Sequence, residues 1–143
     1  MASISDLYVI AAPLDHPEGV AMGPDGTLWA GGEAGQVYRL DPESQTASVV
    51  ANTGGFVLGI AHDAAGRLYV CDAGRSAILR VDPGSGRVDV WCDSAGGEPL
   101  ETPNYLAFAA DGALYFSDSG TESLDVRNGR MIRVPPGGGD GEV

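Results

Sequence analysis

Short runs of alternating apolar and polar residues, separated by glycine-containing turns, recur along the chain. Three segments share one pattern: EGVAMGPDGTLWAGG from Glu18, LGIAHDAAGRLYVCD from Leu58 and NYLAFAADGALYFSD from Asn104. The first run of each segment is apolar at every second position, and a period of two is typical of a strand. The glycine of each following turn, PDG, AAG or ADG, supplies the positive φ that a tight connection needs. Each segment therefore predicts two antiparallel strands joined by a hairpin.

A third run follows in each unit, and a fourth run follows in the first two units. The third runs are QVYRLDP, AILRVDP and RMIRVPP, and weaker fourth runs, TASVVAN and RVDVWCD, come after the first two of them. Proline at the end of a run cannot continue a hydrogen-bonded ladder. Four strands in about 40 residues is the pattern of a β-propeller blade. The sequence predicts an all-β fold, a β-propeller of about three four-stranded blades. These fill one partial domain, 1–143, with blades at roughly 17–55, 56–97 and 103–143.

Composition narrows the possible partners. The 143 residues carry a net charge of −12, and all eight basic residues are arginines. A chain this acidic repels phosphate backbones and anionic lipid surfaces, so we expect neither nucleic acid nor a membrane as partner. Schiff-base chemistry or a lysine base is also excluded, because the chain contains no lysine.

The N-terminal stretch MASISDLYVIAAPLD has no basic flank, and its apolar run is too short for a secretory signal or a membrane span. A cytoplasmic location is therefore expected. Cys71 and Cys92 fall on different predicted strands at a spacing that fits no metal site. We expect two buried thiols, with a disulfide as the less favoured alternative.

The residue eight positions before each turn glycine is the main candidate for chemistry. These residues are Glu18, Leu58 and Asn104. The first strand of every propeller blade lines the central channel, so the three should lie at matching heights around it. A carboxylate and an amide oxygen there suit a hard divalent cation such as Ca²⁺ or Mg²⁺. Alternatively, Glu18 and Asn104 are ordinary turn residues that precede strands.

The two histidines have different expected roles. His16 precedes Glu18 by two residues in the same loop, so it is a candidate to contact a substrate at the channel mouth. His62 shares a predicted strand position with Met22 and Phe108, which favours a packed or hydrogen-bonded histidine over a ligand.

Other polar residues and motifs are weaker candidates for a functional site. The aspartates near the turn glycines, Asp25, Asp63 and Asp111, are explained by turn chemistry. Neither a G-x-S-x-G elbow nor a phosphate-binding P-loop occurs. The segment from Ser117 to Arg130 is a long loop, which is either substrate-facing or mobile.

The segments HPEGVAMGPDGTLWAG, VLGIAHDAAGRLYVCDAG and TPNYLAFAADGALYFSDSG together resemble the first three blades of the gluconolactonase family. This family includes senescence marker protein and the luciferin-regenerating enzyme, with strictosidine synthase close to it. The resemblance implies a six-bladed ring of which this chain is the N-terminal half. It also implies one divalent cation in the channel, for which Glu18 and Asn104 match two of the family's ligands. The later asparagine and aspartate ligands have no counterpart in this chain.

Two positions depart from the family pattern. Lactonases of this family often have arginine two residues before the matching asparagine and aspartate directly after it, where this chain has Thr102 and Tyr105. Thr102 and Tyr105 are thus candidates for substrate contact, although they do not specify a sugar lactone.

The resemblance implies a metal-dependent hydrolase of a small-molecule lactone or ester, with Ca²⁺ as the expected cofactor and Mg²⁺ or Zn²⁺ as alternatives. Its general base would be an acidic residue outside this chain. Two other functions stay open: a non-catalytic propeller that binds a ligand or protein, and a lyase of the streptogramin-cleaving type. Three blades leave two apolar faces open, so we expect either a fragment of a longer product or self-association of two copies to close the ring.

Overall fold

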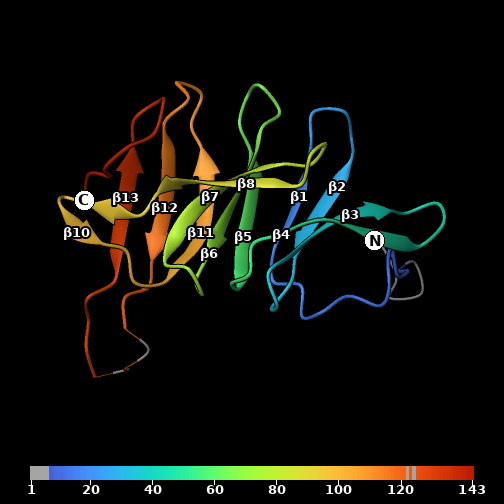
Figure 1. Cartoon of the computed structure of the whole chain (residues 1–143), viewed down its shortest axis with the longest axis horizontal. Helices are drawn as coiled ribbons and strands as arrows, with labels where there is room; N and C mark the ends of the chain where they lie inside the picture. Colours follow the sequence, from blue (N-terminus) through green and yellow to red (C-terminus); the bar gives the residue numbers. More distant parts are fainter. Residues whose placement is uncertain (1–6, 122, 124) are drawn as a thin grey trace.

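The computed structural model describes residues 7–121, 123 and 125–143, and all regular structure in these residues is β (Figure 1). The strands are β1 (Val20–Met22), β2 (Leu28–Gly31), β3 (Gln36–Asp41), β4 (Thr46–Asn52), β5 (Val57–His62), β6 (Leu68–Asp72), β7 (Ala77–Asp82), β8 (Arg87–Cys92), β9 (Ser94–Ala95), β10 (Glu98–Pro99), β11 (Pro103–Phe108), β12 (Leu114–Asp118) and β13 (Arg130–Val134). The predicted fourth runs of the first two units are β4 and β8.

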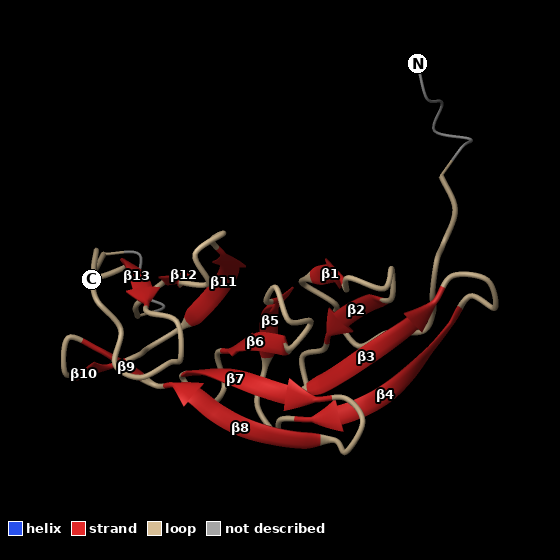
Figure 2. Ribbon diagram, turned by 90° about the horizontal axis from the view of Figure 1, so that it is seen from above, coloured by secondary structure: helices blue, strands red, loops and turns tan. Residues whose placement is uncertain are grey.

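The strands form three successive antiparallel sheets, which we call blades 1, 2 and 3. Blade 1 has the order β1-β2-β3-β4, blade 2 the order β5-β6-β7-β8, and blade 3 the order β11-β12-β13. Figure 2 shows the blades fanned along an arc, with β1, β5 and β11 on its inner side and β4 and β8 on its outer side. The architecture is a partial β-propeller, as the repeats predicted.

The hairpin turns between the first two strands of each blade have the expected chemistry. Gly26, Gly66 and Gly112 have φ values of 81°, 77° and 85°, a region that residues with a side chain seldom adopt. An aspartate closes each turn. Asp25 and Asp111 directly precede their glycines, and Asp25 Oδ1 accepts from Thr27 N at 3.0 Å. Asp63 lies three residues before Gly66, and its Oδ1 accepts from Ala65 N at 3.0 Å. The prediction that these aspartates serve the turns is confirmed.

The apolar residues of the inner strands pack on the blade that precedes them. Ile60 and Leu106 are buried, whereas the matching Val20 of blade 1 is 64% exposed and Met22 is 69% exposed. The difference arises because, among the described residues, no blade packs on this face of blade 1. The three inner strands predicted from the period of two are present, although a register shift interrupts the alternation in β5 between Val57 and Ile60 and in β11 between Pro103 and Leu106. Burial of their apolar residues depends on a neighbouring blade.

Two apolar cores lie between the blades. Blades 1 and 2 share a core that includes Trp29, Val37, Leu68 and Leu79. Blades 2 and 3 share the other, whose buried members are Tyr69, Cys71, Ile78, Cys92, Ala95, Leu100, Leu106, Leu114, Phe116, Ile132 and Val134. Both cysteines are buried and free, which confirms the expectation of two thiols.

Blade 3 differs from the expected four-stranded sheet because three strands are assigned to it. Its fourth strand is represented by a single bridge, in which the N–H of Glu142 and the N–H of Arg133 each donate to the other residue's carbonyl at 2.8 Å. A short hairpin, β9-β10, precedes blade 3. Gly141 N donates to Ser94 O at 2.9 Å, so the last residues of the chain connect this hairpin to β13.

The segment before β1 covers the outer part of the open face of blade 1. Ile10, Ala11 and Leu14 pack around a small cluster of Ala30, Tyr38 and Leu40. Tyr38 also accepts a hydrogen bond from Asp15 N at its hydroxyl, at 3.3 Å. Across the described residues, no helix is long and apolar enough to cross a membrane.

Candidate functional site

Close contact between the inner strands brings the predicted channel residues into one row. A Cβ on Gly19 would lie 2.5 Å from the carbonyl oxygen of Leu58, and a Cβ on Gly59 would lie 2.6 Å from that of Asn104. Glycine at these two positions lets the backbones of neighbouring blades touch. Glu18, Leu58 and Asn104 therefore occupy equivalent places at the end of the sheets where β1, β5 and β11 begin, which we call the entry end.

The two oxygen-bearing residues of this row, Glu18 and Asn104, are exposed. Glu18 is exposed, and its carboxylate accepts no hydrogen bond from the described residues. Asn104 is also exposed, and its Nδ2 lies 3.3 Å from Ser119 Oγ. Because the amide nitrogen takes the serine contact, the amide oxygen stays available to a cation or to a substrate donor. The chemistry of this pair fits a hard divalent cation with water as its other ligands.

Thr102 is held by the backbone around it. Its N–H donates to Asp118 Oδ1 at 2.7 Å, and its hydroxyl donates to the carbonyl of Gly120 at 2.8 Å. Both contacts fix the chain two residues before Asn104. In this arrangement, the Thr102 side chain positions the inner strand of blade 3.

Tyr105 is 68% exposed and lies on the open face of blade 3. Its place in the repeat is that of Gly19 and Gly59, and its own N–H donates to Ser117 Oγ at 3.2 Å. A tyrosine here prevents the close backbone contact that the two glycines allow. A blade placed next to blade 3 would have to accommodate the ring beside the channel.

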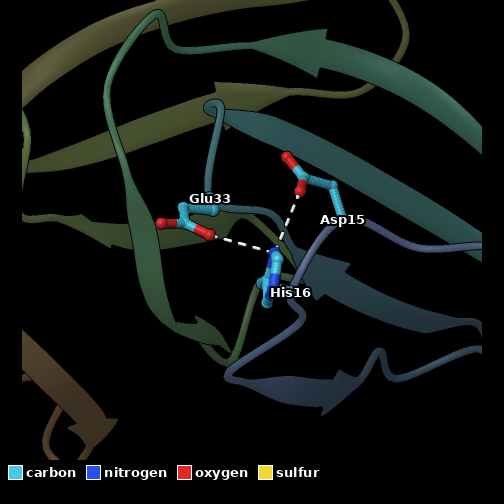
Figure 3. A group of neighbouring side chains, drawn as sticks. All are labelled: Asp15, His16 and Glu33. Carbon is cyan, nitrogen blue, oxygen red and sulfur yellow. Dashed lines mark hydrogen bonds and ion pairs between the residues drawn. The ribbon is translucent and has the colours of Figure 1, made fainter.

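His16 lies in a cluster of three titratable side chains at the entry end (Figure 3). Its Nδ1 is 3.2 Å from Asp15 Oδ1 and 3.0 Å from Glu33 Oε2. The pKa of Asp15 is lowered by the hydrogen bond with His16, then by those from Gln36 and from the Ala34 N–H. We call this group the Asp15–His16–Glu33 cluster. His62, in contrast, packs edge-on against Trp29 and its Nδ1 lies 3.2 Å from the Gly66 carbonyl, as expected for a packed histidine.

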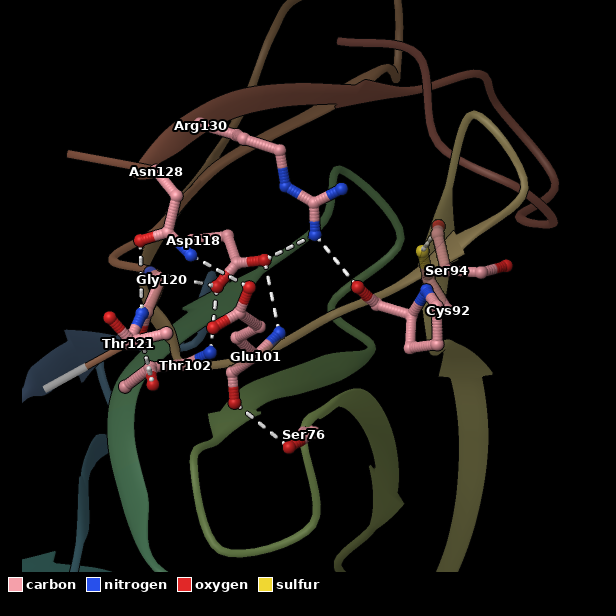
Figure 4. A network of polar contacts seen from close by, with 11 residues as sticks. Ser76, Cys92, Ser94, Glu101, Thr102, Asp118, Gly120, Thr121, Asn128 and Arg130 are labelled. Atoms are coloured by element: carbon pink, nitrogen blue, oxygen red, sulfur yellow. Dashed lines mark hydrogen bonds and ion pairs between the residues drawn. The ribbon is translucent and has the colours of Figure 1, made fainter. Parts of the chain in front are cut away.

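The long loop after β12 is attached to the entry end by a partly buried ion pair (Figure 4). Arg130 Nη2 lies 2.7 Å from Asp118 Oδ2 and also donates to the Pro99 carbonyl at 2.8 Å. Burial alone would raise the pKa of Asp118, but the hydrogen bonds from Arg130 and from the backbone N–H groups of Thr102, Glu101 and Gly120 outweigh it, so the pKa is lowered.

A second set of contacts holds the same loop. Asn128 Oδ1 accepts from Thr121 N at 3.1 Å, and Asn128 Nδ2 donates to Glu101 Oε1 at 2.8 Å. Residues 122 and 124 of this loop lie outside the described residues. The described part of the loop therefore joins β12, β13 and the segment before β11 into one unit beside Asn104.

Sequence reasoning missed the buried aspartates that end β6 and β12. Asp72 Oδ1 accepts from the N–H groups of Phe56 and Arg75, at 2.9 and 3.0 Å, and Asp118 has the equivalent place in blade 3. The signal was present, since VCDAG and FSDSG align in the repeats. Glu33 and Asp15 had no such signal, because the fold brings them together from separate segments.

Comparison with known proteins shows the family of this chain. The family model for the "SMP-30/Gluconolactonase/LRE-like region" matches residues 16–142. The chain belongs to this family. A gluconolactonase of Zymomonas mobilis is 39% identical over 62 residues, which are 42% of this chain and 17% of that protein. Strictosidine synthase-like protein 4 of Arabidopsis thaliana is 32% identical over 114 residues, 76% of this chain and 30% of that protein.

Solved structures with the same fold include a gluconolactonase and a virginiamycin B lyase. A gluconolactonase from Xanthomonas campestris superposes with a TM-score of 0.79 at 28% identity, over 93% of this chain and 48% of that one. The chain thus spans about half of that structure and less of the curated relatives. A virginiamycin B lyase from Staphylococcus aureus, with a TM-score of 0.64 at 18% identity over 84% of this chain and 38% of that one, shares the propeller fold alone.

Proposed function

We propose that this chain supplies half of the site of a metal-dependent hydrolase that acts on a small lactone or related ester. The observation that carries the proposal is the row at the entry end, where Gly19 and Gly59 align Glu18 with Asn104 around the channel. Membership of the SMP-30/gluconolactonase family supports the reaction class. Ca²⁺ is the cation we propose, with Mg²⁺ and Zn²⁺ as alternatives.

Glu18 and Asn104 would hold the cation, through a carboxylate oxygen and the amide Oδ1 respectively. A bound divalent cation would polarise the ester carbonyl and offset the negative charge that develops on its oxygen. Glu18 supplies the negative charge that attracts the cation. Ser119 would orient the Asn104 amide through the 3.3 Å contact between its Oγ and Nδ2, which leaves the amide oxygen available to the cation. Thr102, fixed by Asp118 and Gly120, sets the height of Asn104 on the channel wall.

The channel wall must be completed for this chemistry, and we propose that a second copy completes it when the 143-residue chain is purified alone. The open face of blade 3 repeats the buried face of blade 2. In both blades, a tyrosine of the second strand pairs with an arginine of the third strand. The pairs are Tyr115 with Arg133 in blade 3 and Tyr69 with Arg80 in blade 2. Met131, 66% exposed, has the place of buried Ile78.

The receiving face is that of blade 1, where Val20 and Met22 stand exposed in the places of Ile60 and His62. Because the segment around Ile10 covers the outer part of this face, it would have to move aside for a blade to dock. When the open face of blade 3 packs on blade 1 of the other copy, the two chains form a closed ring if the rotation that relates them permits it. Two half-rings would then place Glu18 and Asn104 twice around one axis.

The experiment is a chelator-stripped sample tested for Ca²⁺ binding by calorimetry and for lactone hydrolysis in a pH-indicator assay. Wild-type chain should bind Ca²⁺ and hydrolyse the lactone only after Ca²⁺ is restored, and Glu18→Gln should lose both. Glu43→Gln, in the exposed turn between β3 and β4, is the matched control and should keep both. Ca²⁺ binding that is unaffected by Glu18→Gln, or hydrolysis that survives the chelator, would overturn the proposal. Self-associated protein without Ca²⁺-dependent hydrolysis would overturn it as well.

A further inference from the structure

A second polar group at the entry end is independent of the channel row. The Asp15–His16–Glu33 cluster forms where the segment before β1 meets the loop between β2 and β3 (Figure 3). Glu33 N donates to the Asp15 carbonyl at 3.2 Å, which ties the two segments together. The three side chains are thus held by backbone contacts between parts of the chain that are remote in sequence.

The donor atoms of this cluster converge. His16 Nδ1 is 3.2 Å from Asp15 Oδ1 and 3.0 Å from Glu33 Oε2, and one ligand atom from each of the three residues lies within 4.8 Å of the other two. In a tetrahedral site with metal–ligand bonds of about 2.1 Å, neighbouring ligand atoms are separated by about 3.4 Å. Small side-chain rotations would therefore bring all three atoms around one ion.

The carboxylates of Asp15 and Glu33 face the same ring nitrogen of His16. An imidazole Nδ1 carries at most one hydrogen, so two carboxylates must share it. A metal ion at this point would satisfy the nitrogen and both carboxylates at once. The backbone of His16 has a φ of 38°, in the left-handed region.

Asp15 is already oriented as a ligand by groups outside the cluster. Its Oδ2 accepts from Ala34 N and from Gln36 Nε2, each at 3.1 Å, which leaves Oδ1 directed at His16. Partners of this kind fix the orientation of metal ligands in proteins and raise metal affinity. Gln36 is the first residue of β3, so the support comes from the sheet itself.

The ligand types select the class of metal. Calcium and magnesium take oxygen ligands, whereas an imidazole together with carboxylates suits zinc and neighbouring transition metals. Glu18 and Asn104 offer oxygen alone, so the two groups should prefer different ions. The imidazole and both carboxylates are partly or largely exposed, which leaves room for water to complete the coordination.

We propose that Asp15, His16 and Glu33 bind one divalent transition-metal ion of the Zn²⁺ class. This inference does not depend on the proposed hydrolase. The side chains are at the surface of blade 1, so the site would be complete within one chain. Its occupancy would tie the segment before β1 to the loop between β2 and β3.

The test is calorimetric titration of the chelator-treated chain with Zn²⁺, together with ¹⁵N NMR of the histidine rings. We expect one Zn²⁺ per chain and a shift of the His16 ring nitrogens without a comparable shift for His62. His16→Gln and Glu33→Gln should each weaken binding by about tenfold or more, since even outer partners of metal ligands have effects of this size. Glu43→Gln should bind as the wild type does.

One more variant distinguishes metal binding at this cluster from metal binding at Glu18 and Asn104. Glu18→Gln should leave Zn²⁺ binding at the Asp15–His16–Glu33 cluster intact, whatever it does to Ca²⁺ binding. Circular dichroism on each variant would show that the fold is retained, as expected for exposed positions. Absence of saturable Zn²⁺ binding, or Zn²⁺ binding with unchanged affinity in His16→Gln, would overturn the proposal.

Discussion

The backbone of Gly59 lies against the carbonyl oxygen of Asn104, so close that a Cβ on Gly59 would be 2.6 Å from that oxygen. This contact sets the separation of the inner strands of blades 2 and 3. It therefore also sets the position of Asn104, which is the part of the candidate site that blade 3 contributes. Gly19 makes the same contact with Leu58 one blade earlier. Packing of the propeller and placement of the site thus depend on the same two glycines.

Gly59→Ala should destabilise the chain and displace Asn104. The added methyl group forces the two backbones apart, and overpacking of this kind costs about 1–3 kcal/mol. Urea denaturation would measure the loss. Gly129→Ala is the matched control, because the nearest heavy atoms to its Cβ would lie 3.5 Å away, an ordinary contact. Equal midpoints for the two variants would show that the inner strands are not in tight contact.

Asp118→Asn should be strongly destabilising because it leaves the partly buried guanidinium of Arg130 without its counter-charge. Breaking a buried charged pair from one side costs about 3–5 kcal/mol. Denaturant unfolding at neutral pH measures this cost. Asp111→Asn, in an exposed turn where the amide oxygen can still accept from Ala113 N, should change stability by less than about 1 kcal/mol. A similar effect of both substitutions would contradict the role given to Asp118.

Stability should also fall in acid, and Asp118 should account for part of that fall. Its pKa in the folded chain is below the ordinary value of 3.8, so its contribution is fully present above that value and is lost as the pH drops through the lower, folded-state pKa. Unfolding midpoints measured from pH 7 downward would show the loss beginning near pH 4. The profile of Asp118→Asn should be flatter in that acidic window. An unchanged slope would mean that other carboxylates dominate.

Cys71 and Cys92 should not react with thiol reagents in the folded chain. Burial raises the pKa of both thiols, which keeps them protonated, and it also blocks access. A chromogenic disulfide reagent should detect two thiols per chain after denaturation and almost none before. Rapid labelling of the native chain would indicate that the core between blades 2 and 3 opens readily.

Met131→Glu should reduce self-association of the purified chain. The charge would sit on the open face of blade 3 that we propose packs on blade 1 of a second copy. Light scattering should show wild-type chain as a dimer and the variant as a monomer. Val90→Glu, on the outer strand of blade 2, should still dimerise. A monomeric wild-type chain would assign the open face to further blades of a longer protein.

Several features of the site could be read from the sequence because they are local or periodic. The alternation of apolar residues predicted the strands, the turn glycines predicted the hairpins, and counting back from those glycines placed Glu18 and Asn104 in equivalent positions. Each of these three inferences required only the repeated sequence pattern. By the same argument, the aligned aspartates Asp72 and Asp118 could have been found.

Other features depended on contacts between distant segments. Asp15 and Glu33 meet around His16 only when blade 1 is assembled. In the same way, Arg130 attaches the long loop to Asp118 only when blade 3 is assembled. The exposure of Val20, in contrast to buried Ile60, depends on whether a neighbouring blade is present.

The sequence by itself determined the strands, their turns, the propeller repeat and the family, because backbone geometry and side-chain alternation act over a few residues. Only the tertiary structure decided which polar atoms meet, which carboxylates are buried and which apolar faces stay open. The physical reason is that side-chain convergence and burial depend on packing between segments far apart in the chain.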